Sequence, residues 1–145
     1  MSRTVQQLFN LEGRTALVTG GSRGLGWQMA QALGEAGARV LLSSRKADDL
    51  VQACEALQAQ GIEADWIAAD AGREEDIHRL AQEAMGRLGQ VDILVNNAGA
   101  TWGAPAEDHP TAAWDKVMNL NVRGYFLLSQ QVGKLSMIPR RQGRI

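Results

Sequence analysis

The chain has 145 residues, of which 45% are hydrophobic and 21% are charged, and its formal net charge is −1 at pH 7. The length suits one domain around one core, and the near-neutral charge argues against a nucleic-acid partner or a polybasic membrane patch. No apolar run reaches membrane-spanning length, and the N-terminal residues lack the apolar core of a signal peptide. We therefore expect a soluble cytoplasmic domain that binds neither nucleic acid nor membrane, with Arg140, Arg141 and Arg144 in a solvated turn.

Short apolar strands and amphipathic helices alternate along the first two thirds of the chain. Strands are expected at residues 14–19, 39–43, 64–69 and 91–95, with helices between them at residues 25–36, 48–59 and 74–88. This alternation is typical of right-handed βαβ crossovers and of a parallel sheet covered on both faces. The sequence thus predicts an α/β fold, namely a Rossmann-type doubly wound sheet in three αβα layers.

The last third of the chain follows a different pattern. A loop rich in glycine, proline and alanine covers residues 98–110, and a long apolar helix is expected over residues 111–137, ended by Pro139. The final residues GRI look like the start of another strand. The one cysteine, Cys54, lies on the apolar face of the second predicted helix, so we interpret it as a core residue in a protein of a reducing compartment.

Glycines cluster where the first predicted strand ends, in the stretch ALVTGGSRGLGWQMA. Gly20, Gly24 and Gly26 follow the spacing T-G-x-x-x-G-x-G, which is neither G-x-G-x-x-G nor a P-loop, because no G-K-[ST] follows. A tight turn would require glycine for steric reasons alone. Between a strand and a helix, however, glycines let a dinucleotide pyrophosphate approach the N–H groups at the helix N-terminus, and this interpretation is favoured.

The end of the second predicted strand indicates which dinucleotide binds. An acidic residue about 20 residues past the glycines would bind the ribose hydroxyls of NAD, but Ser43, Ser44 and Arg45 stand there. The guanidinium groups of Arg45 and of Arg23, in the glycine loop, suit a 2′-phosphate. The alternative is two exposed arginines at loop tips. Because the acid is also missing, we expect NADP(H) rather than NAD(H).

Together with NNAG at residues 96–99 and NLNVRGYF at residues 119–126, these motifs resemble the short-chain dehydrogenase/reductase superfamily over nearly the whole chain. The opening LFNLEGRTALVTGGSRGLG is especially similar to gluconate 5-dehydrogenase-like and 3-oxoacyl-carrier-protein reductase-like members. The resemblance implies strand order 3-2-1-4-5-6-7 and an oxidoreductase that moves hydride between NADP(H) and a carbonyl or secondary alcohol. Since a complete sheet of this type needs about 250 residues, we expect residues 1–145 to be the N-terminal, NADP(H)-binding part of a one-domain enzyme, truncated after the fifth helix.

The resemblance also implies a set of cofactor-binding residues and no metal site. In the family, the acid at Asp70 faces the adenine, while Ala71 departs from the commoner branched residue. The NNAG segment supports the sheet and lines the cofactor ribose, although from its residues alone it is ordinary turn chemistry. The implied cofactor-binding residues are Gly20, Ser22, Arg23, Gly24, Leu25, Gly26, Ser44, Arg45, Asp70, Ala71, Asn97, Ala98 and Gly99.

Asn121 is the one residue to which the resemblance assigns a catalytic role. Asparagine is mildly unfavourable inside a helix, and in the family the matching residue bends the helix and holds a water linked to the active-site lysine. The alternative is an asparagine on the polar edge of the helix. The family's serine and Tyr-x-x-x-Lys are not in these residues, since Tyr125 is followed four positions later by Ser129. His78 and His109 are poor substitutes, so we expect these 145 residues alone to be inactive.

The resemblance implies a small-molecule carbonyl or alcohol substrate near the loop over residues 100–110. It also implies a homodimer or homotetramer formed through the helix over residues 111–137. Trp102 and Trp114 either line the substrate cleft or pack against their own helix, and packing is favoured. Two other classes stay open: a nucleotide-binding or interaction fragment without catalysis, and a methyltransferase, which NNAG and Arg45 disfavour.

Overall fold

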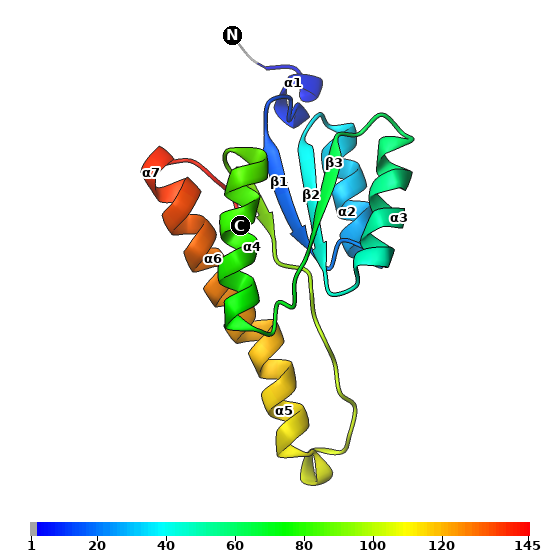
Figure 1. Ribbon diagram of the computed structural model, residues 1–145, viewed down its shortest axis with the longest axis vertical. Helices are drawn as coiled ribbons and strands as arrows, with labels where there is room; N and C mark the ends of the chain where they lie inside the picture. The colour runs from blue at the N-terminus through cyan, green and yellow to red at the C-terminus, as the bar shows by residue number, and fades with distance from the viewer. Residues whose placement is uncertain (1–2) are drawn as a thin grey trace.

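The computed structural model describes residues 3–145, which form a parallel sheet between two layers of helices (Figure 1). The predicted Rossmann-type fold is confirmed, and each strand or intervening helix begins and ends within two residues of its predicted bounds. The strand order is β3-β2-β1-β4, as the resemblance implied. The strands are β1 (Thr15–Thr19), β2 (Arg39–Ser44), β3 (Ala64–Ala68) and β4 (Ile93–Val95), and the helices between them are α2 (Gly24–Glu35), α3 (Ala47–Gln58) and α4 (Glu74–Leu88).

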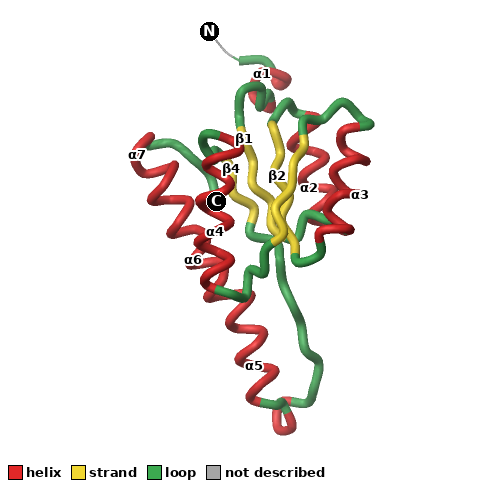
Figure 2. Tube along the Cα trace, in the orientation of Figure 1, coloured by secondary structure: helices red, strands yellow, loops and turns green. Residues whose placement is uncertain are grey.

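The sheet divides the core into two parts, because successive side chains of a strand point to opposite faces. In β1, Ala16 and Val18 belong to the cluster under α2 and α3, whereas Leu17 belongs to the cluster under α4 and the later helix α6 (Tyr125–Val132). Figure 2 shows these two helical layers on either side of the strands. Cys54 lies in the first cluster and is 3% exposed, which confirms it as a core residue.

A short helix, α1 (Val5–Phe9), precedes the sheet and was not predicted. Thr4 and Gln7 form a capping box in which the Thr4 side chain accepts from the Gln7 N–H and the Gln7 side chain accepts from the Thr4 N–H. None of the α1 residues is buried. The capping pattern was therefore readable in the sequence, whereas a buried apolar face, the usual signal of a helix, is missing here.

The predicted long helix is present but irregular. It consists of α5 (Thr111–Met118), the π-helical segment η2 (Asn119–Gly124), α6, the π-helical segment η3 (Gly133–Met137) and α7 (Ile138–Arg140). The prediction that Pro139 ends the helix was wrong, because Pro139 lies in the first turn of α7, where no N–H donor is required. The helix ends at Arg141, whose backbone is left-handed with φ of 50°. Within residues 3–145, no helix has the combined length and apolarity needed to cross a bilayer.

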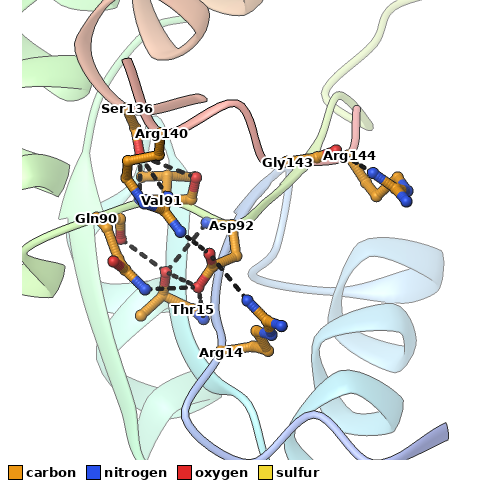
Figure 3. Close-up of polar contacts among 9 residues, drawn as sticks. All are labelled: Arg14, Thr15, Gln90, Val91, Asp92, Ser136, Arg140, Gly143 and Arg144. Carbon is orange, nitrogen blue, oxygen red and sulfur yellow. Dashed lines mark hydrogen bonds and ion pairs between the residues drawn. The ribbon is translucent and has the colours of Figure 1, made fainter. Parts of the chain in front are cut away.

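The prediction of a solvated turn was also wrong for Arg140, which pairs with the buried carboxylate of Asp92 (Figure 3). Asp92 precedes β4 and is 4% exposed. Its Oδ2 accepts from the backbone N–H of Thr15 at 3.0 Å and from Gln90 Nε2 at 3.1 Å, and its Oδ1 lies 3.7 Å from Arg14 Nη1. This set, here called the Asp92 cluster, joins the end of α7 to the beginnings of β1 and β4.

The predicted start of another strand appears at the end of the chain. Arg144 forms a parallel bridge with Ile93: its N–H donates to the Asp92 carbonyl, and its own carbonyl accepts from the Leu94 N–H, both at 2.9 Å. Arg144 and Arg141 are exposed, as predicted. Arg144 thus pairs with β4 along the edge that faces away from β1.

Candidate functional site

A cleft of about 420 Å³ opens at the carboxyl ends of the strands, where open α/β sheets bind their ligands. It lies between the loops that follow β1, β2, β3 and β4, and it extends to α5, which projects beyond the sheet together with the loop before it (Figure 1). The residues that line the cleft are Thr19, Gly20, Ser22, Arg23, Gly24, Ser43, Ser44, Arg45, Lys46, Asp49, Ala69, Asp70, Ala71, Asn97, Ala98, Gly99, Ala100, Lys116 and Leu120.

The structure brings together most of the residues that the sequence assigned to a cofactor. Of these, only Leu25 and Gly26 are outside the lining: Leu25 is 72% exposed, and Gly26 is buried beneath the loop. The assignment of this group to a cofactor stays a prediction, but its members do share one cleft. Those in the lining are Gly20, Ser22, Arg23, Gly24, Ser44, Arg45, Asp70, Ala71, Asn97, Ala98 and Gly99.

The glycines of the loop after β1 have different structural roles. Gly20 and Gly24 have φ of 63° and 58°, values that side-chain-bearing residues rarely adopt. A Cβ at Gly24 would meet nothing within 4 Å, so this glycine borders open space. A Cβ at Gly26 would instead overlap the Gly20 carbonyl oxygen, which also accepts from Asn97 Nδ2 at 3.2 Å. Gly26 therefore lets α2 begin directly under the loop, with its N-terminal dipole at the cleft.

The charges of the lining favour an anionic ligand. Four cationic side chains and two carboxylates lie there, and β2 ends in Ser43 and Ser44, followed by Arg45 and not by an acid. Eight lining residues were not among the predicted cofactor-binding residues, namely Thr19, Ser43, Lys46, Asp49, Ala69, Ala100, Lys116 and Leu120. Lys116 and Leu120 are four residues apart, a spacing that places two side chains on one face of a helix. That spacing was readable, but it does not reveal which face the cleft adjoins.

Asp70 sits in a turn that its own side chain stabilises. Its Oδ1 accepts from the Gly72 N–H at 2.9 Å, and its backbone N–H donates to Asp76 Oδ2 at 2.8 Å. The hydrogen bond from the Asp70 backbone, together with Arg79, lowers the pKa of Asp76. The lowered pKa keeps Asp76 anionic to a lower pH than an ordinary aspartate, so this acceptor stays available to the turn.

Asn121 lies outside the lining and acts on the loop after β4. Its Oδ1 accepts from the Ala100 N–H at 2.9 Å, and its Nδ2 donates to the Ala100 carbonyl at 2.8 Å. The side chain thus mimics a strand partner for Ala100, and it does so from η2, where the helix is irregular. A π-helical turn within an α-helix often marks a functional site. The catalytic role of Asn121 stays a prediction.

The aromatic side chains near the cleft do not form an acid–base site. Trp102 and Trp114 are more than half exposed and lie outside the lining. The ring of Trp114 meets that of His109, in the loop before α5, edge-on with ring centroids 6.4 Å apart. The packing of the two tryptophans against their own helix stays a prediction. Burial raises the pKa of Tyr125, which is the opposite of what a proton-transfer tyrosine needs. His78 is about half exposed on α4 and faces Glu74.

Comparisons with known proteins agree with this geometry. A family model described as "short chain dehydrogenase" matches residues 14–145. The rhamnolipids biosynthesis 3-oxoacyl-[acyl-carrier-protein] reductase of Pseudomonas aeruginosa is 50% identical over 125 residues, which cover 86% of this chain and 48% of that protein. The gluconate 5-dehydrogenase of Gluconobacter oxydans is 38% identical over 138 residues, covering 95% and 54%.

Solved structures show the same likeness. The gluconate 5-dehydrogenase of Burkholderia cenocepacia in complex with NADP and tartrate superposes with a TM-score of 0.90 at 33% identity, covering 97% of this chain and 55% of that one. A doubly wound sheet with a glycine-lined cleft at its switch point places the chain in the dinucleotide-binding class of α/β folds. It belongs to the short-chain dehydrogenase family. The chain spans about half the length of the curated relatives it matches.

Proposed function

We propose that this chain forms the NADP(H)-binding part of an oxidoreductase that transfers hydride between the nicotinamide and a carbonyl or secondary alcohol. The observation that carries the proposal is a single cleft in which a glycine loop, Arg23 and Arg45 meet and in which the end of β2 has no acid. Relatives solved with NADP, and relatives named as reductases or dehydrogenases, support it.

The cleft fits such a cofactor. Gly24 combines a left-handed backbone with open space beyond its α-carbon, which is the cradle a pyrophosphate needs at the N-terminus of α2. Arg45 and Arg23 would bind the 2′-phosphate, and Asp70 and Ala71 would adjoin the adenine. When bound, the cofactor supplies the hydride chemistry. The residues of this chain bind and orient it.

Proton transfer is assigned to groups outside these 145 residues. Tyr125 is half-buried with a raised pKa, and Ser129 stands where a lysine would be needed to activate it. Asn121 would contribute by fixing the loop after β4 near the reacting end of the cofactor. The second candidate is a nucleotide-binding protein without catalytic turnover. It would have the same cleft but would lack the catalytic serine and the Tyr-x-x-x-Lys motif.

The proposed partner surface is a stripe of apolar side chains along the long helix. Trp114, Met118, Val122 and Phe126 recur every four residues and are all exposed, between 37% and 62%. Such a stripe on a helix is suited to packing against a second copy, which supports a homodimer or homotetramer.

The location and the substrate are proposed as follows. The one cysteine, Cys54, is a free and buried thiol, which supports the cytoplasm as the location. The substrate is proposed to be a small carbonyl compound or alcohol.

Calorimetric titration with NADPH, NADH and S-adenosylmethionine tests the proposal. We expect NADPH to bind about 10- to 100-fold more tightly than NADH, because a charge-assisted arginine–phosphate hydrogen bond contributes about 1.5–3 kcal/mol. Equal affinity for the two nucleotides would refute the preference for NADP(H). Binding of S-adenosylmethionine with neither dinucleotide bound would refute the oxidoreductase assignment.

A further inference from the structure

The π-helical segment η2 makes side-chain hydrogen bonds to two separate loops of the cleft. Asn121 holds Ala100 in the loop after β4. Two residues earlier, Asn119 Nδ2 donates to the carbonyl oxygen of Gly72, in the loop after β3, at 2.7 Å. Residues two apart in a helix point to roughly opposite sides of its axis. Leu120, between them, lines the cleft itself.

The loop that Asn119 holds is the one that carries Asp70 and Ala71. Asp70 and Gly72 are joined by the Asx turn in which the Gly72 N–H donates to Asp70 Oδ1, and the Arg73 N–H donates to the Asp70 carbonyl at 3.0 Å. The position of the Asp70 carboxylate therefore depends on where Gly72 lies. The only side-chain bond to the Gly72 carbonyl, among residues 3–145, comes from Asn119.

The same loop also presses directly on η2. A Cβ at Gly124 would overlap the Ala71 carbonyl oxygen, so the loop and the helix meet backbone to backbone at this point. The ion pair between Arg123 and Glu74 adds a contact at the start of α4. The loop thus contacts η2 at Ala71 and at Gly72, and the half-buried Asn119 amide donates the hydrogen bond at Gly72.

We propose that Asn119 is a positioning residue for the adenosine half of NADP(H), because its amide fixes the turn that carries Asp70 and Ala71. This inference rests on the proposed function. Asn119 lies outside the cleft lining, so it acts through the turn and not by touching the cofactor. Without its donor, the Gly72 carbonyl loses its side-chain partner and the turn gains freedom, which binding of the adenosine must then remove.

The test compares Asn119→Ala and Asn119→Asp with Gln58→Ala and Gln58→Glu. Gln58 is the control, because its Nε2 also donates to a backbone carbonyl in a part-buried hydrogen bond, that of Ala64 at 2.8 Å, at the opposite end of β3. The alanine variants remove the donor without adding charge, and the acidic variants keep the side-chain shape. All four are expected to lower Tm by a few degrees, as the loss of one hydrogen bond does.

Only the Asn119 variants are expected to weaken binding of adenosine 2′,5′-bisphosphate, the adenosine half of NADP, by about tenfold in calorimetry. Hydrogen exchange of the peptide covering residues 69–73 should rise in these variants and stay unchanged in the Gln58 pair.

If the wild-type protein binds the bisphosphate, and the Asn119 and Gln58 variants bind it with equal affinity, this inference alone is overturned. Wild-type protein that fails to bind the bisphosphate would contradict the proposed function, and this inference with it.

Discussion

Replacing Asp92 with asparagine tests whether the Asp92 cluster holds the end of α7 to the sheet. The substitution keeps the shape of the side chain but removes its charge. Oδ2 accepts from Thr15 and Gln90, and Oδ1 faces Arg140 and Arg14 (Figure 3). If the asparagine oxygen takes the place of Oδ2, its amide nitrogen turns toward two guanidinium groups, where a donor meets only donors.

The size of the effect follows from the exposure of the partners. Breaking a buried ion pair destabilises a protein by about 3–5 kcal/mol. Asp92 is 4% exposed, but the side chains of Arg140 and Arg14 are 27% and 44% exposed, so water replaces part of the lost interaction. We therefore expect the lower end, about 3 kcal/mol, which corresponds to a decrease in Tm of about 6–12 °C for a chain of this length.

Urea unfolding at pH 7 measures this difference, with Asp65→Asn as the control. Asp65 pairs with Arg87 at 2.9 Å but is half-exposed, so its loss should change the free energy of unfolding by less than about 1 kcal/mol. If Asp92→Asn destabilises no more than Asp65→Asn does, the cluster does not hold α7 and the reasoning fails.

The pH dependence gives a second test of the same cluster. Burial alone would raise the pKa of Asp92, but hydrogen bonds from Arg140, Thr15 and Gln90 outweigh burial and hold the pKa below its ordinary value of 3.8. A lowered pKa in the folded state stabilises the protein above the ordinary value, and this stability is lost as the pH falls through the lowered pKa. The stability gap between wild type and Asp92→Asn should therefore shrink below about pH 4, and a gap that stays constant down to pH 2 would contradict this assignment.

Three further outcomes are expected. Gly26→Ala should destabilise the protein and weaken NADPH binding, because the new Cβ would overlap the Gly20 carbonyl. Gly86→Ala, in open space on α4, should instead stabilise the protein by about 0.5–1 kcal/mol. Equal Tm values for the two variants would contradict this expectation. Arg45→Asp should shift the binding preference from NADPH toward NADH, and unchanged relative affinities in a titration would refute the role of Arg45. Cys54 should resist a thiol reagent at pH 8 until the protein unfolds, since burial and, to a lesser degree, Asp65 raise its pKa to about 11; fast labelling of the folded protein would be the contrary result.

Local patterns were enough to predict the elements of the sheet and its helices. The bounds of α4 match the prediction because the signals lie within the segment: Glu74, Glu75 and Asp76 in the first turn, and Gly89 with φ of 77° just after Leu88. Apolar runs that end in glycine placed β1 and the loop after it. These signals depend on residues a few positions apart, so a sequence contains them in full.

The irregular geometry of the helix after β4 could not be predicted from such local patterns. Its apolar periodicity predicted a helix, and the family resemblance implied a bend at Asn121. Nothing in the spacing of Asn119 and Asn121, however, indicated a π-helical segment. The irregularity lies where two loops meet the helix and where Gly124 receives the Ala71 carbonyl. Those loops come from other parts of the chain.

The polar contacts at both ends of the sheet were decided only by the tertiary structure. Arg140 meets Asp92 from 48 residues away, and Asn119 meets Gly72 from 47. By itself, the sequence determined the class of fold, the glycine loop and the missing acid after β2. Which charges are neutralised and which amides hold the cleft depends on strand order and on how the helices pack over the sheet, because these bring distant polar groups within hydrogen-bonding distance.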